Sequence, residues 1–86
     1  MSSVEEVKAG VARFGDEVGQ RVGAIRASAE ALDRSTAALR GITSGSSHSQ
    51  VSETIAKVEQ AKQKLAEAAA LTQSAIESSH GYATSF

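Results

Sequence analysis

The sequence predicts an all-α protein, an antiparallel two-helix hairpin, from three observations. Apolar residues recur every seven positions between Val4 and Leu39, which is the interval of a long amphipathic helix. A segment rich in glycine and serine, residues 41–48, interrupts the chain near its middle. The chain contains no proline, so the segments on both sides can be uninterrupted helices. We therefore expect one domain, residues 1–86, with helices at 4–40 and 49–80, a turn at 41–48 and a tail at 81–86.

The first helix has a clear start and a clear end in the sequence. Ser3 followed by Glu6 forms a capping box, in which the serine hydroxyl accepts a hydrogen bond from an amide of the first turn. Arg40 suits the negative end of the helix dipole, and Gly41 suits the left-handed residue that follows a helix. The apolar stripe of this helix is predicted to form its core or interface face: Val4, Val7, Val11, Phe14, Val18, Val22, Ile25, Leu32 and Leu39.

Glycines at positions 15, 19 and 23 repeat every four residues within this helix. Each glycine costs roughly 0.5–1 kcal/mol of helix stability relative to alanine. One interpretation is a stripe where another backbone approaches closely, as small residues allow. The alternatives are that the glycines are merely tolerated, because Gly19 and Gly23 rotate away from the apolar stripe, or that they let this half of the helix bend.

The second helix is predicted to begin at Ser47 or Ser49, since Ser47 and Gln50 can form a second capping box. Lys62 interrupts its apolar stripe, where the aliphatic stem can lie along the seam while the ammonium stays in water. Leu71 and Tyr82 fall outside the stripe and, with Ala68 and Ala75, outline a second apolar edge. The main stripe supplies the predicted core or interface residues Val51, Ile55, Val58, Leu65 and Ile76.

A single helix cannot bury its own stripe, and a chain of 86 residues leaves much of its surface exposed unless a second chain covers it. The surplus apolar edge indicates packing against further helices. We therefore expect the hairpin to pair with itself or with a sister hairpin into a four-helix bundle. The sequence leaves open whether two hairpins dock parallel or antiparallel.

Composition disfavours several classes of partner. Nine basic and ten acidic residues are interspersed along the chain, so no basic face is available for nucleic acid or an anionic membrane. No apolar run approaches the ~20 residues that span a bilayer. The opening residues lack the features of a Sec signal peptide. The sequence therefore predicts a cytoplasmic protein, or one exported without a cleaved Sec signal.

No residue pattern predicts catalysis or a cofactor. The chain has no cysteine, and its two histidines, His48 and His80, are expected at opposite ends of a hairpin, so they cannot share a metal. His80 suits a helix C-terminal cation. Two slender helices rich in alanine also offer no dry, concave pocket for a small-molecule substrate. We expect no enzyme activity, no metal and no cofactor.

The chain resembles the Trp-x-Gly helical hairpins of the type VII secretion system of actinobacteria and related Gram-positive bacteria. The resemblance rests on two helices of similar length, the turn Gly41–Gly45, the lack of cysteine, and a short tail with Tyr82. Two diagnostic motifs differ: the turn has no Trp, and the fourth residue after Tyr82 is Phe86 where the export signal of the family has an acid. The resemblance implies a secreted partner, a targeting adaptor or an escort, with Tyr82 as a possible tail signal. The alternative is a structural or regulatory coiled-coil module without a link to secretion.

Overall fold

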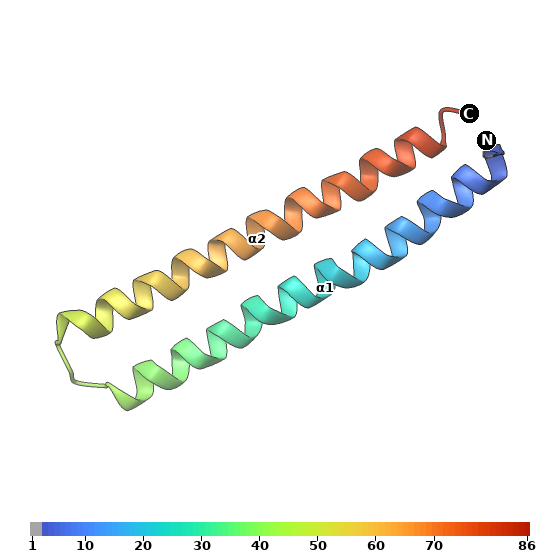
Figure 1. Cartoon of the computed structure of the whole chain (residues 1–86). Helices are drawn as coiled ribbons and strands as arrows, with labels where there is room; N and C mark the ends of the chain where they lie inside the picture. The colour runs from blue at the N-terminus through green and yellow to red at the C-terminus, as the bar shows by residue number, and fades with distance from the viewer. Residues whose placement is uncertain (1–2) are drawn as a thin grey trace.

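The computed structural model describes residues 3–86, so the first two residues of the predicted domain lie outside the described residues. Two helices, α1 (Val4–Ile42) and α2 (Ser49–Ala83), pack along each other in opposite directions. The loop lies at one end of the molecule and both termini lie at the other (Figure 1). The prediction of an all-α helical hairpin is confirmed.

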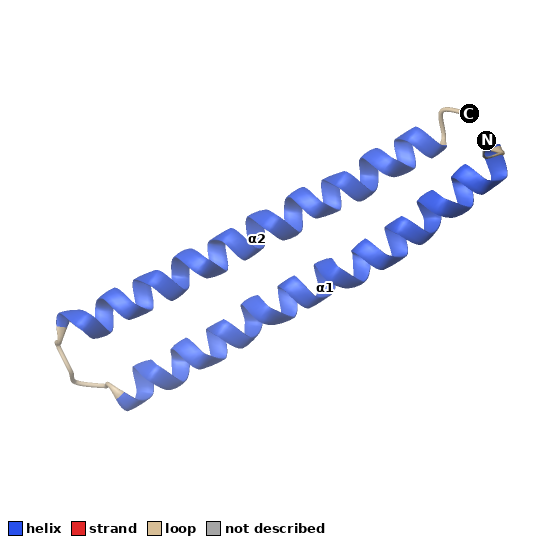
Figure 2. Ribbon diagram, in the orientation of Figure 1, coloured by secondary structure: helices blue, strands red, loops and turns tan. Residues whose placement is uncertain are grey.

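The described part of the chain is a rod that measures 64 × 17 × 15 Å. Figure 2 shows its two helices side by side, connected by the short tan loop. Because the rod is only two helices wide and one helix deep, each helix has a single neighbour and most of its circumference faces outward. This thin shape decides how little of the chain can be buried.

The start of α1 is the predicted one. Ser3 has extended backbone angles, and its hydroxyl accepts a hydrogen bond from the Glu6 amide at 3.2 Å. Glu5 and Glu6 lie in the first turn, where the helix dipole favours negative charge. The hydroxyl half of the predicted capping box is therefore confirmed.

The predicted end of α1 at Arg40, with Gly41 in the left-handed conformation, is wrong. The helix continues through Gly41 and Ile42, and Thr43 closes it by donating both its amide and its hydroxyl to the Leu39 carbonyl, at 2.9 and 2.7 Å. Gly45 is the glycine with a positive φ, of 86°. It occupies the third position of a turn in which the Ser46 amide bonds the Thr43 carbonyl, and a type II turn requires a positive φ there.

Helix α2 begins at Ser49, which is one of the two predicted starts. Its N-cap residue, however, is neither Ser47 nor Ser49. His48 caps the helix, because its Nδ1 accepts a hydrogen bond from the Gln50 amide at 3.1 Å. The Ser46 hydroxyl in turn accepts from the His48 amide at 3.3 Å. An imidazole nitrogen thus takes the place of the serine oxygen that the sequence pattern favours.

The second helix also runs past its predicted end at residue 80. It ends at Ala83, and the Thr84 amide bonds the His80 carbonyl at 3.0 Å. Ala83, which was assigned to the tail, is buried. Its methyl group continues the inward face of α2 by one further turn, which explains why the helix does not stop at Gly81.

Candidate interaction surface

The inward faces of both helices follow a regular spacing of alternately three and four residues. This spacing is the heptad pattern of an antiparallel coiled coil. We call these two lines the seam. In α1 its buried and half-buried members include Val11, Gly15, Val18, Val22, Ile25, Ala29, Leu32, Thr36 and Leu39, and in α2 they are Val51, Ile55, Val58, Lys62, Leu65, Ala69, Thr72, Ile76, Ser79 and Ala83.

The seam buries little apolar surface. Its hydrophobic core cluster consists of Val22, Ala69 and Ile76, against which Val18 and Ile25 pack. No large side chain among residues 3–86 is completely buried. Because one neighbouring helix covers only one side of a seam side chain, most seam residues stay half-exposed. The hairpin by itself therefore has the beginning of a core rather than a closed one.

Two polar side chains, Thr36 and Lys62, occupy seam positions in the half of the rod near the loop. Thr36 is buried, and its hydroxyl has no hydrogen-bond partner within the described chain. Three other threonines, at positions 43, 54 and 72, each donate to the carbonyl four residues earlier, at 2.6–2.7 Å. An unsatisfied buried hydroxyl costs free energy, so the packing of the seam is less favourable around Thr36 than around Val22.

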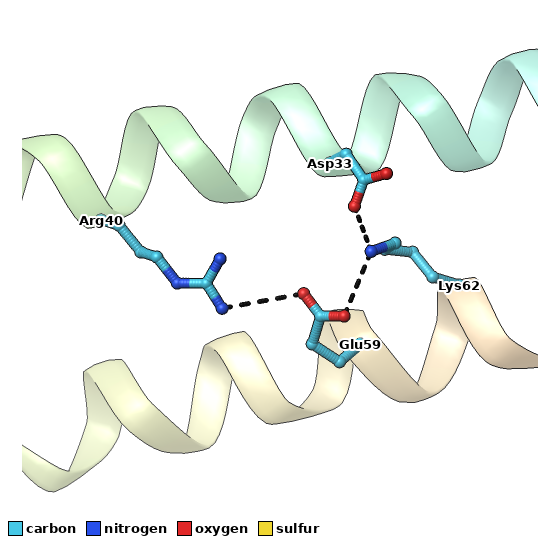
Figure 3. Close-up of polar contacts among 4 residues, drawn as sticks. All are labelled: Asp33, Arg40, Glu59 and Lys62. Carbon is cyan, nitrogen blue, oxygen red and sulfur yellow. Dashed lines mark hydrogen bonds and ion pairs between the residues drawn. The ribbon is translucent and has the colours of Figure 1, made fainter.

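Lys62 joins the two helices through a small ionic network (Figure 3). Its Nζ bonds Asp33 of α1 and lies 3.1 Å from Glu59 Oε2 of α2. Glu59 also lies 3.8 Å from the Arg40 guanidinium. The hydrogen bond with Asp33, followed by the one with Glu59, raises the pKa of Lys62 above its ordinary value of 10.5. The ammonium is thus held by two carboxylates, and this differs from the predicted free ammonium in water.

Gly15 is the one glycine of the predicted stripe that makes a close approach. A Cβ atom at Gly15 would lie 3.1 Å from His80 Nε2 and 3.7 Å from Ile76 Cγ2. Cβ atoms at Gly19 and Gly23 would meet nothing within 4 Å in the hairpin. The neighbour at Gly15 is an imidazole side chain rather than the backbone of another helix.

The structure places the predicted core and interface residues at three levels of exposure. Val22 and Ile76 are buried, whereas Val4 and Phe14 are each 41% exposed. Phe14 turns outward because Gly15 takes the seam position beside it. The half-buried members of the predicted set are Val7, Val11, Val18, Ile25, Leu32, Leu39, Val51, Ile55, Val58 and Leu65. Tyr82 is 56% exposed and stacks edge-on against Phe86, with ring centroids 5.2 Å apart.

The two sides of the hairpin, to either side of the seam, differ in charge. Asp33 and Arg40 mark one side of α1, and Glu59 marks the same side of α2. We call this side the charged flank. Positions two residues further along each helix are rotated by about 200° and lie on the other side. That line contains Phe14 and Ile42 in α1 and Ala61, Ala68, Ala75 and Tyr82 in α2.

The other side, which we call the apolar flank, gathers the exposed large hydrophobic residues. Leu71 lies between Ala68 and Ala75 on this side, and Phe86 reaches it through its contact with Tyr82. Val4 continues the seam beyond the end of α2. The described charged residues on this flank are Glu17, Arg21, Lys57 and Lys64. Its exposed large apolar residues are Phe14, Ile42, Leu71, Tyr82 and Phe86. Sequence reasoning found only the α2 half of this surface, because the facing half on α1 depends on how the helices are rotated in the hairpin.

A shallow groove on the charged flank is lined mainly by aliphatic side chains, including Ile25, Ala29, Leu65 and Ala69. Arg26 and Glu30 stand at its edge. This lining provides no nucleophile and no histidine, so the groove lacks the converging polar groups of a catalytic site. Among residues 3–86 no group of histidine and acidic side chains could hold a metal ion. His48 and His80 are separated by most of the length of α2, about 48 Å at 1.5 Å per residue.

No helix in the described part of the chain combines the length and apolar character required to cross a bilayer. Comparisons with protein-family models, with curated proteins and with solved structures found no match for this chain. The class that the fold defines is therefore the small all-α helical hairpin, and its candidate functional surface is the apolar flank together with the half-buried seam.

Proposed function

We propose that this protein is a non-catalytic protein–protein interaction module that binds a second helical hairpin, either its own copy or a sister chain. The observation that carries this proposal is the apolar flank, where five large hydrophobic residues are exposed on one side of the rod and three of them, Phe14, Tyr82 and Phe86, lie at its terminal end. Exposed apolar residues gathered on one face are typical of association surfaces. Burying them against further helices would also complete the half-exposed seam.

The leading version of this function is a type VII secretion-like adaptor, substrate or partner. Two features support it: the hairpin shape, and an aromatic tail in which Tyr82 and Phe86 contact each other at the exposed end of α2. The tail lies beside the N-terminal end of α1, away from the loop (Figure 1). A partner could therefore bind it without disturbing the loop end of the hairpin.

The alternative is a structural or regulatory coiled-coil module without a role in secretion. The absence of Trp from residues 41–48 and of an acid at Phe86 supports this alternative. Replacing Tyr82 with Ala, or removing residues 82–86, separates the two versions. Loss of export, with helicity and partner binding unchanged, supports the secretion-like version, whereas loss of binding alone fits both versions because Tyr82 and Phe86 belong to the apolar flank. Unchanged export and binding would remove its only motif.

The association itself is tested by the mass of the purified protein over a concentration series, with helicity followed in parallel. A helical dimer, or a melting temperature that rises with protein concentration, is the expected result because association buries the apolar flank. A poorly helical monomer that becomes helical when a sister hairpin is added would indicate that the natural partner is a sister chain. A stably folded monomer at every concentration, unaffected by another hairpin, would contradict it.

A further inference from the structure

We propose that the apolar flanks of two copies of this chain pack face to face, related by a two-fold axis parallel to the long axis of the hairpin. In this arrangement α1 of one copy lies against α2 of the other, and all neighbouring helices are antiparallel. The inference rests on the proposed function and deepens it by naming the partner, the surface and the orientation.

The size of the surface suits a second copy. One side of a rod 64 Å long and 15–17 Å wide offers roughly 1,000 Å², compared with about 800 Å² per partner in a standard protein interface. A second hairpin has the same length and width, so it covers the whole flank and not only a part of it. The charged flank of each copy then remains in water.

The contacts within the hairpin fix which residues of the two helices lie at the same level along the rod. Gly15 lies beside His80, and Asp33 lies beside Lys62. In both contacts the two residue numbers add up to 95. Because the helices are antiparallel, an α1 residue and an α2 residue whose numbers add up to about 95 lie at the same level along the rod. A two-fold axis along the rod keeps every level unchanged, and it brings each α1 residue opposite the partner's α2 residue of the same level.

Over the middle and the loop end of the apolar flank, this rule sets large side chains opposite small ones. The pairs that share a level along its outer line are Leu71 with Ala24, Lys64 with Ala31 and Lys57 with Ala38. Nearer the seam, Arg21 is level with Ala75 to within one residue, and Ile42 with Thr54. At the terminal end of the same line, Phe14 is level with Tyr82, so two aromatic side chains face each other there. Alternation of large and small residues across facing positions allows two surfaces to interdigitate. Between the levels of Arg21 and Ile42 the flank is therefore complementary in size to its own copy, and at the terminal end it brings aromatic rings together.

Charge fits the same arrangement. Lys57 and Lys64 each lie level with an alanine, so no two lysines face each other across the interface. Their aliphatic stems can cover the alanine surface while the ammonium groups reach water at the edge. An isologous contact of this kind uses one patch twice and closes after two copies.

A two-fold axis perpendicular to the rod gives a different set of contacts. It would place α1 against the partner's α1 and α2 against the partner's α2. Ala24 and Leu71 lie near the middle of the rod, at the same level, so each would then approach its own counterpart. The two arrangements therefore differ in which of these positions come together.

Disulfide cross-linking distinguishes the arrangements, and the chain contains no native cysteine that could interfere. One full-length chain carries Ala24→Cys and a second carries Leu71→Cys. The two are unfolded together, refolded and oxidised. We expect a cross-linked dimer in the mixture and almost none with either variant alone. Efficient cross-linking of each variant with itself would overturn the proposed axis.

A matched pair of substitutions tests the flank. Ala24 and Ala37 are both exposed on α1, but Ala37 lies between Asp33 and Arg40 on the charged flank. We expect Ala24→Glu to weaken the dimer at least tenfold in its dissociation constant and Ala37→Glu to leave it unchanged. Equal effects of the two would overturn the choice of flank.

The solution mass separates a failure of this inference from a failure of the proposed function. A dimer that gives no cross-link between positions 24 and 71 overturns the docking and leaves the association module standing. A monomer that folds only with a sister hairpin overturns the second copy as partner, again without contradicting the module. A monomer that is stably folded by itself and binds no hairpin contradicts both.

Discussion

Lys62 is the residue where the seam is most unusual, because a charged side chain occupies a position that its heptad assigns to the core. Its ammonium is held between Asp33 and Glu59, on different helices. Both carboxylates are substantially exposed, so the network contributes little to stability, as surface ion pairs do. Its main effect is on alignment, since a polar group at a single seam position can fix the register of a coiled coil.

The raised pKa of Lys62 predicts a loss of stability at alkaline pH. Since the folded-state pKa lies above the ordinary value of 10.5, the contribution is fully present below that pH and disappears as the pH rises through the folded-state pKa. Urea unfolding at neutral pH and above this value measures the loss. Lys62→Met is expected to reduce it, and Lys8→Met serves as the exposed control. An identical pH dependence in Lys62→Met would contradict the role of the network.

Gly15 and Gly19 provide a matched test of the close approach to His80. Gly19→Ala is expected to stabilise the hairpin by about 0.5–1 kcal/mol, because its new methyl group meets open space. Gly15→Ala is expected to gain less, since the imidazole of His80 must move. Chemical denaturation of both variants gives the difference. In a His80→Ala background the two gains should become equal, and a persistent difference would argue against the imidazole as its cause.

At the scale of the elements, the ends of the helices are set by single side chains. Thr43 closes α1 through two hydrogen bonds to Leu39, and His48 caps α2 with its ring nitrogen. Between them, Ser46 bonds both the Thr43 carbonyl and the His48 amide. The loop is therefore a connected set of caps, and its glycines have different roles.

Gly41 and Gly45 differ in backbone conformation, and alanine substitutions should show this. Gly45→Ala is expected to cost about 1–2 kcal/mol, because φ is 86° and a side chain disfavours the left-handed region. Gly41→Ala is expected to stabilise the protein by about 0.5–1 kcal/mol, since Gly41 is helical and open. Thermal melts followed by circular dichroism report both. A loss at Gly41 would restore the prediction that α1 ends there.

At the scale of the whole molecule, the core is concentrated around the middle of the rod, at Val22, Ala69 and Ile76. The half near the loop carries Thr36, Lys62 and the ionic network. Stability is therefore uneven along the rod, and opening from the loop end costs less than opening from the middle.

Ile76→Ala tests this distribution. Ile76 is buried at 6% exposure, so removing its side chain should cost about 2–5 kcal/mol. Leu65→Ala should cost less, because Leu65 is half-buried beside the groove on the charged flank. Denaturant unfolding at one fixed protein concentration compares them. Equal losses would show that Leu65 is covered as fully as Ile76 in solution.

The sequence by itself determined the hairpin, because a seven-residue apolar interval and a glycine-rich turn are local signals that tertiary packing did not override. It also located the Ser3 cap and the place of Lys62 within the stripe. Only the tertiary structure decided the rotation of the helices about their axes, which turned Phe14 outward, brought Gly15 against His80, and gathered the exposed apolar residues on one flank. The physical reason is that a helix with few large side chains has several possible inward faces of similar free energy. The choice among them depends on contacts with a residue far away in the chain.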